Sequence, residues 1–204
     1  MRLKLMKMWL YRCLVLGEYN RGIECINIEQ SINNKIRICD AISHYLKGSL
    51  QEANEGNEFA LSDEAKEIYE NKCATANQLI TAKKERWSLI LQNFNSPADQ
   101  VKHLLQDDEQ ETIRDDDRLI DLLLRRDCII SYSKEIYASL SEIFSGQDLK
   151  LVRGKLKETH REVRDSKLFV ALHMHAGDGN VHSNIPVNSN DYEMLAEADR
   201  IVDR

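Results

Sequence analysis

The sequence predicts a mostly α-helical chain with a β-hairpin near the C-terminus, in which long antiparallel helices precede a strand, a turn, a second strand and a helix. Charged residues make up 30% of the chain and hydrophobic residues 42%, a balance typical of helices with one buried face. Apolar residues recur every three or four positions through much of residues 62–166, which favours helices. Over residues 168–175 this spacing changes to an alternation, which indicates a strand.

Composition and cysteine spacing limit the classes of function. The net charge of −6 gives no electrostatic reason to expect nucleic acid as a partner. The five cysteines are never closer than twelve residues, so no CxxC zinc or redox motif is present, and scattered thiols fit a reducing compartment. Arg12 interrupts the apolar N-terminal stretch, which therefore does not read as a signal peptide, and no segment is long enough to span a bilayer. We expect a cytoplasmic protein.

The expected organisation has three parts. Residues 1–58 show only weak periodicity, end in the polar linker QEANEGNEF and stay unassigned. Residues 59–166 are expected to form a helical region, because its apolar residues follow the helical period. Residues 167–204 differ in composition and are expected to begin a separate domain.

The helical region is expected to contain four helices. Ser62 is a good N-cap for the first, which runs to about residue 94 and is broken by NSP. Pro97 suits the first turn of a short helix, and the acidic run DDEQETIRDDD follows as a solvated connector. A third helix is expected over about 117–145 and a fourth over about 149–164. Two long helices joined by a short element indicate an antiparallel pair.

Packing and solvation explain most side chains of this region. Trp87, Tyr132 and Tyr137 are expected in the core, and the acidic residues 115–117 on a solvated face. Five basic residues are expected to be ordinary exposed helix charges, namely Lys83, Lys84, Arg86, Arg125 and Arg126.

The segment KLFVALHMHAGDGNVHSNIPV holds three of the six histidines and two of the eight glycines. Its first half alternates between an apolar face and a face that carries His173 and His175, and is expected to be a largely buried strand. AGDGN is dense in residues that form tight turns, and VHSNIPV is the second strand. A helix is expected from Asp191, with Asn190 and Glu193 as its capping box.

His175 and His182 are the candidate metal ligands. They can share one face of an antiparallel pair only if the numbers of the paired residues sum to 357. This register requires a six-residue turn over residues 176–181 or an equivalent bulge. Two adjacent imidazoles suit a divalent ion such as zinc or manganese. His173 is expected to pack or to support the ligands, and Asp178 to accept hydrogen bonds from backbone amides of the turn.

HAGDGNVHSNIPV closely resembles the HxGDGNxHxN signature of the FAD-linked oxidase C-terminal domain. That domain belongs to flavoproteins of the vanillyl-alcohol oxidase type, which include D-lactate dehydrogenases and the glycolate oxidase D subunit. The fuller stretch FVALHMHAGDGNVHSNIPVNS looks most like the large bacterial FAD/FMN-containing oxidoreductases of that superfamily. The resemblance covers about residues 167–204, and the helices at 62–166 are compatible with the helical insertion of the larger members.

The resemblance implies roles for individual residues. The family's two metal-binding histidines fall on His175 and His182, and its substrate-contacting asparagine falls on Asn184. In the family, a 2-hydroxy acid is held by the metal and basic side chains while hydride passes to the flavin. The turn of the motif matches Gly177, Asp178, Gly179 and Asn180.

The resemblance also implies that this chain is one part of a larger enzyme. A domain that binds FAD through glycine-rich loops should precede the motif, and no such loop occurs here. A further carboxylate ligand and the catalytic histidine should lie well past Arg204. We therefore expect a fragment or truncated version whose FAD is bound mainly by a domain outside these residues, and its catalytic residue is not assigned.

Two other classes of protein are compatible with parts of the sequence. The HxH formed by residues 173–175 is typical of amidohydrolase-like barrels and favours a metal-dependent hydrolase, although the chain has too few strands for a barrel. The helices at 62–166 could alone form a helical interaction module, which would leave the hairpin unexplained. An absorbance scan separates these classes, because only the oxidoreductase carries flavin.

Overall fold

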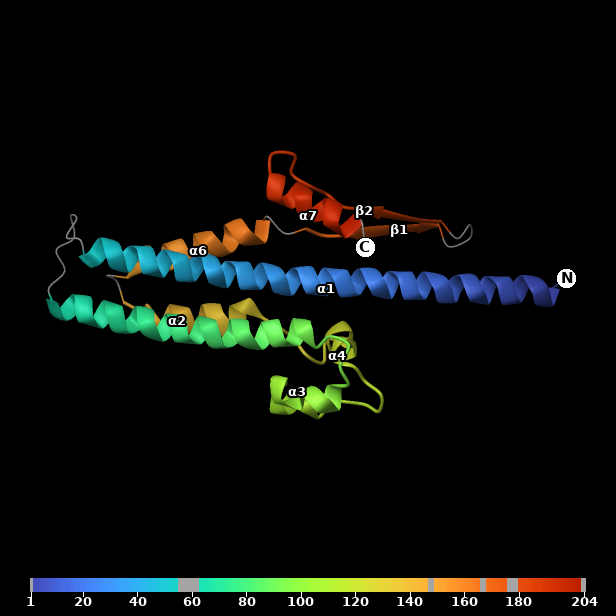
Figure 1. Cartoon of the computed structure of the whole chain (residues 1–204), viewed down its shortest axis with the longest axis horizontal. Helices are drawn as coiled ribbons and strands as arrows, with labels where there is room; N and C mark the ends of the chain where they lie inside the picture. The colour runs from blue at the N-terminus through green and yellow to red at the C-terminus, as the bar shows by residue number, and fades with distance from the viewer. Residues whose placement is uncertain (1, 55–62, 147–148, 166–167, 176–179, 203–204) are drawn as a thin grey trace. The chain divides into compact units, whose positions relative to one another are not determined.

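The computed structural model describes residues 2–54, 63–146, 149–165, 168–175 and 180–202. Helices make up 74% of it, and a two-stranded antiparallel sheet precedes the last helix (Figure 1). The predicted fold class is therefore confirmed. Within these residues, every helix is too short or too polar to cross a membrane.

The chain folds into two compact units. The hairpin unit comprises Met1–Ser31 and Ser166–Arg204, and the helical unit comprises Ile32–Asp165. Helix α1 (Arg2–Asn54) contributes its first part to the hairpin unit and the rest to the helical unit. The weak periodicity of residues 1–58 does not predict this helix. Its isoleucines and asparagines have low helix propensity, so packing against other elements must supply its stability.

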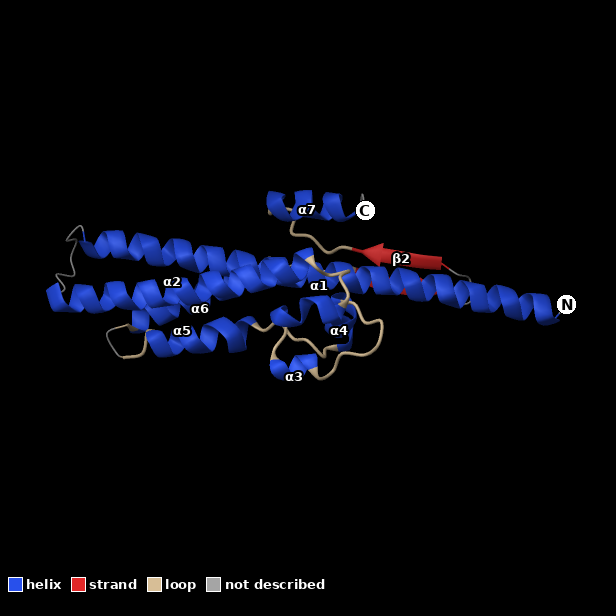
Figure 2. Ribbon diagram, turned by 60° about the horizontal axis from the view of Figure 1, so that its bottom comes forward, coloured by secondary structure: helices blue, strands red, loops and turns tan. Residues whose placement is uncertain are grey.

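Helix α2 (Asp63–Gln92) runs antiparallel to the second part of α1 (Figures 1 and 2). Tyr69 shares a hydrogen bond with Ser49 near the start of α2, and Lys84 donates one to Asp40 near its end. Residue numbers thus rise along one helix as they fall along the other. Ser62, the expected N-cap of α2, lies outside the described residues.

The rest of the helical unit consists of shorter elements that pack on these two helices. Trp87 of α2 is fully buried at the centre of the core, as predicted. Other large and fully buried side chains of this unit include Ile42, Leu46, Ile80, Leu140 and Phe144. The shorter elements are η1 (Ala98–Leu104), α3 (Asp107–Gln110), α4 (Leu119–Arg125), η2 (Ser133–Tyr137), α5 (Ala138–Ile143) and α6 (Lys150–Asp165).

The third predicted helix, over residues 117–145, is wrong as a single helix. Helix α4 ends at Arg126, which takes the left-handed conformation with φ of 65°. The amide of Asp127 then donates to the carbonyl oxygen of Leu122 at 2.9 Å, and this bond closes the helix end. The chain resumes as one π-helical turn, η2, before α5.

The composition of the acidic connector over residues 107–117 predicts a solvated segment, but two of its carboxylates are largely buried or paired. Glu109 is only 6% exposed, and the Asp117 side chain is bound by Arg125. Asp116 lies in a turn and adopts a positive φ of 63°. Ion pairing therefore anchors this segment to the helical core.

The hairpin unit contains strands β1 (Ala171–His175) and β2 (Asn180–Asn184) and helix α7 (Tyr192–Val202). Its core consists of Leu168, Val170, Ala198 and Ile201, packed with Ile23, Ile26, Ile185 and Met194. The N-cap of α7 is Asp191, whose Oδ1 accepts a hydrogen bond from the Met194 amide at 3.0 Å. The expected capping box at Asn190 is thus wrong by one position.

Candidate metal and substrate site

The two strands that carry the candidate ligands pair directly. His173 lies opposite His182, and His175 lies opposite Asn180. The numbers of paired residues sum to 355, not 357, and residues 176–179 separate the strands. The expected six-residue turn with His175 opposite His182 is therefore wrong. Residues 180 and 181 instead belong to strand β2. Their backbone groups pair with β1, and this pairing would be lost if they were part of a longer turn.

The site lies on the outward face of the hairpin. His173, His182 and Asn184 are exposed, and they share this face because Ala171 pairs with Asn184 and His173 with His182. The opposite face continues into the core at Val170, which is 3% exposed. The predicted alternation of β1 is confirmed by this burial, but the strand is half-buried, not largely buried.

The motif's turn lies outside the described residues, which include neither Gly177, Asp178 nor Gly179. Asn180 is the first residue of β2, and His175 is the last residue of β1. For these two residues the structure describes the backbone and not the side chain. The roles that the resemblance implies for them remain predictions.

Asn27 of α1 fixes the entry of β1. Its Nδ2 donates to the carbonyl oxygen of Val170 at 3.2 Å, and its Oδ1 accepts from the Val170 amide at 3.1 Å. Gln30, one turn further along, donates to Glu197 of α7 at 2.6 Å. Sequence reasoning missed both residues. Their spacing was the available signal. Residues 27, 30 and 34 carry side-chain amides at intervals of three and four positions in an isoleucine-rich stretch, which is the spacing of one face of a helix.

The hairpin offers an incomplete set of metal ligands. In the described ranges, no group of three or more His, Cys, Asp or Glu side chains could hold a metal ion. His173 and His182 are directly opposite each other in the strand pairing, and imidazole is a donor type that suits zinc and other borderline ions. A pair fits two positions of a tetrahedral ion and leaves the others to different donors.

Two basic residues of α2 converge on buried carboxylates, contrary to the expectation that they are ordinary exposed charges. Arg86 donates to Glu135 at 3.0 Å and to Glu109 at 3.1 Å, and the Lys83 ammonium lies 3.6 Å from Glu135. Each carboxylate also accepts a hydrogen bond from a backbone amide. For Glu135, this donor is the amide of Ser131, at 2.9 Å. Hydrogen bonds from several segments thus occupy both carboxylates, so the network holds the chain together and offers no free base.

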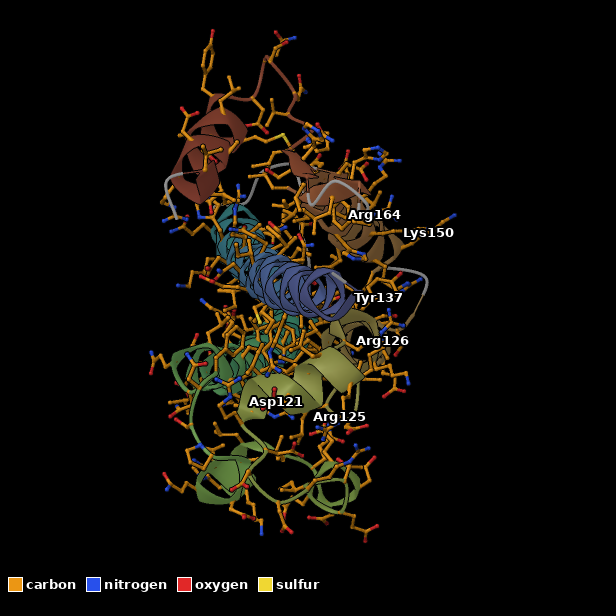
Figure 3. The ribbon with its side chains drawn as sticks, turned by 90° about the vertical axis from the view of Figure 1, so that its right-hand side faces the viewer. Asp121, Arg125, Arg126, Tyr137, Lys150 and Arg164 are labelled. Atoms are coloured by element: carbon orange, nitrogen blue, oxygen red, sulfur yellow. The ribbon has the colours of Figure 1, made fainter. Side chains whose placement is uncertain are left out.

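Arg125 is also engaged. It binds Asp117 through two hydrogen bonds and Asp127 through a third at 2.8 Å. Figure 3 shows Arg125 and Arg126 leaving the end of α4 in different directions, with Arg125 toward the connector. Arg126 is exposed, as expected.

The buried thiols do not provide a nucleophile. Burial raises the pKa of Cys39 to about 12, and burial together with Glu109 does the same for Cys128. A thiol with such a pKa is protonated at neutral pH and therefore unreactive. Among the described residues, the outward face of the hairpin remains the best candidate for a chemical site.

No family model, no curated protein sequence and no solved structure matches the chain.

Proposed function

We propose that this chain is part of a flavin-dependent oxidoreductase that oxidises a 2-hydroxy acid by hydride transfer to FAD. One observation carries the proposal: the HAGDGNVHSN motif spans the turn of an antiparallel hairpin, with His182 and Asn184 exposed on one face. Residues that bind an ion and a substrate must share such a face and be open to solvent.

In this proposal, His175 and His182 bind a divalent ion, either zinc or manganese. The ion would polarise the oxygens of the hydroxy acid as a Lewis acid. Asn184 lies two residues beyond His182 on the same strand, so its amide can hydrogen-bond a substrate held beside the ion. Ala171 is opposite Asn184, and its small side chain leaves room over that end of the face.

The described residues do not fit the phosphates of FAD. Cradling a pyrophosphate requires a glycine-rich loop at a helix N-terminus. Gly22, Gly48 and Gly154 instead lie inside helices α1 and α6, and Gly146 stands alone after α5. We therefore propose that FAD is bound mainly by a different part of the enzyme, which is then an obligatory partner of these residues. The flavin supplies the redox chemistry.

A cytoplasmic location is part of the proposal. Cys39, Cys73 and Cys128 are buried free thiols, which agrees with a reducing environment.

The test uses the intact enzyme that contains this chain. Its oxidation of a panel of D- and L-2-hydroxy acids is measured by the reduction of a dye acceptor. The proposal predicts flavin absorbance and turnover that His182→Ala lowers by about a hundredfold or more. Asn184→Ala should mainly raise KM, because Asn184 binds substrate. His103→Ala, at an exposed histidine of η1, is the matched control and should retain activity. Metal-dependent ester or amide hydrolysis without flavin would instead favour a hydrolase.

A further inference from the structure

Helix α6 is a basic element in an acidic chain. Its 16 residues include six lysine and arginine side chains and three carboxylates, a net charge of +3, whereas the whole chain carries −6. The acidic connector over residues 107–117 has seven carboxylates and one arginine, a net charge of −6. We propose that α6 of one chain binds the acidic connector of a second copy, so that the helical unit carries both halves of one self-association contact. This contact does not depend on the proposed oxidation of a hydroxy acid.

Four cations of α6 form a continuous line on its surface, which we call the cationic ridge. At about 100° per residue their positions fall within an arc of about 60°, and they extend over about 21 Å of the helix. Figure 3 shows Lys150 and Arg164, the first and last of them, on the outer side of the helical unit. The ridge consists of Lys150, Lys157, Arg161 and Arg164, all of which are exposed.

The packing of α6 holds the ridge toward solvent. Val152, Leu156 and Thr159 are buried on the opposite side of the helix, so the helix has one fixed orientation on the core. Arg153 donates to the carbonyl oxygen of Phe144 at 2.6 Å and ties down the first turn. The ridge is therefore a surface that is formed before any partner arrives.

Most of the charge on the ridge has no counter-charge beside it. In the parts of the chain that the structure describes, Arg164 is the one member that forms a salt bridge, with Asp165. Glu158, which lies next to the ridge on α6, is bound by Lys155 instead. The ridge can thus accept three further carboxylates without breaking an existing pair.

The connector presents the matching charge. Five of its seven carboxylates are exposed, and within the described ranges none of the five forms a salt bridge or a side-chain hydrogen bond. The other two, Glu109 and Asp117, are bound by arginines, which holds the connector against the helical core. The five exposed residues are Asp107, Asp108, Glu111, Asp115 and Asp116.

The two surfaces do not neutralise each other within one chain. Figures 1 and 3 show α6 and α3 on opposite sides of the paired part of helices α1 and α2. Charges that are more than about 10 Å apart are largely screened at about 0.1 M salt. A second copy can bring its connector to the ridge, and its own ridge stays open to another copy or to the closure of a ring.

The surroundings of the ridge favour an acidic loop over other polyanions. Glu158 and Glu162 lie along the flank of the ridge, where they repel the broad charged surface of a nucleic acid duplex. The net charge of −6 also opposes the approach of a long nucleic acid. Since each exposed ion pair contributes little, we expect an association that is weak and sensitive to salt.

The test is analytical ultracentrifugation of the 204-residue chain at about 50 mM and about 500 mM salt. At low salt the average mass should rise with protein concentration, and at high salt it should return to that of one chain. Removal of three charges from either surface should raise Kd by roughly tenfold or more. The ridge variant is Lys150→Gln with Lys157→Gln and Arg161→Gln, and the connector variant is Asp108→Asn with Glu111→Gln and Asp115→Asn.

An equimolar mixture of these two variants separates a ridge–connector contact from a general effect of charge. One variant keeps an intact connector and the other an intact ridge, so the mixture should regain the Kd of the parent chain and stop at two chains. The control removes three exposed cations outside the ridge and should associate like the parent: Lys47→Gln with Lys102→Gln and Lys134→Gln. Far-UV circular dichroism of each variant must match that of the parent chain.

Three results would overturn the proposal. The first is a parent chain that stays monomeric at low salt up to about 1 mM, the Kd of a very weak complex. The second is a mixture of the two variants that associates no better than either variant alone. The third is a monomeric parent chain that binds a fluorescent single-stranded oligonucleotide, with binding lost in the ridge variant, because the ridge would then serve a nucleic acid.

Discussion

Arg125 holds Asp117 through two parallel hydrogen bonds, from Nη1 to Oδ1 at 2.8 Å and from Nη2 to Oδ2 at 2.7 Å. The pair joins the end of α4 to the end of the acidic connector. Hydrogen bonds from Arg125 lower the pKa of Asp117 to about 2, from an ordinary value of 3.8. The side chains are 27% and 10% exposed, so solvent screens the pair only in part.

We expect Arg125→Met to lower the free energy of unfolding by about 1–2 kcal/mol near neutral pH. Because the folded-state pKa of Asp117 is depressed, this contribution is present above the ordinary pKa and is lost as pH falls through the folded-state value. Urea unfolding at about pH 7, 4 and 2.5 should therefore show the difference between parent and variant shrinking below about pH 4. Lys102→Met, in the exposed pair with Asp99, is the control and should change little. An undiminished difference at the lowest pH would contradict this reading.

Arg126→Gly should stabilise the helical unit by about 0.5–1 kcal/mol, because Arg126 has a positive φ of 65° that glycine adopts without steric cost. The gain is partly offset by the greater freedom of glycine in the unfolded chain. Thermal unfolding measures the change. Arg126→Ala removes the same side chain but keeps a Cβ, so it should not be stabilising. If the two substitutions changed stability equally, the cause would be the loss of the Arg126 charge and not the backbone conformation.

Asn27→Ala should destabilise the hairpin unit by about 1–3 kcal/mol, since it leaves the buried amide and carbonyl groups of Val170 without their side-chain partner. Hydrogen exchange of the β1 and β2 amides should accelerate, while exchange in α2 stays unchanged. Asn33→Ala removes a half-buried asparagine from the same helix and serves as the control. Uniform acceleration across both units would indicate global destabilisation.

The 204-residue chain should not bind FAD with useful affinity, because its described residues provide no loop for the pyrophosphate. Titration followed by flavin fluorescence should show neither quenching nor a shift, and the purified chain should lack flavin absorbance. Flavin that co-purifies in stoichiometric amount would disprove this prediction.

The sequence predicts well those elements whose signal is local. The hairpin follows from the alternation through His173 and His175 and from a turn rich in glycine, and α2 follows from one apolar stripe that includes Trp87. Each of these two signals is contained in a continuous stretch of sequence, so tertiary contacts are not needed to detect it.

The missed features depend on residues that are far apart in the chain or on a conformation without a sequence signal. Arg126 ends α4 in the left-handed conformation, which glycine or asparagine would have signalled and arginine does not. Arg86 finds its carboxylates at Glu109 and Glu135, both of which come from later segments. The register of the hairpin was missed by two residues because a glycine-rich turn permits several lengths.

The shared helix α1 has a consequence for the order of folding during synthesis. Asn27 and its partner Val170 are separated by 143 positions, and Gln30 and Glu197 by 167. Ile23 and Ile26 therefore leave the ribosome on the order of ten seconds before the residues that bury them. The helical unit can close its core in that interval, whereas the hairpin unit can complete its core only after residues 168–201 have been made. Until then, the N-terminal apolar positions are open to chaperones.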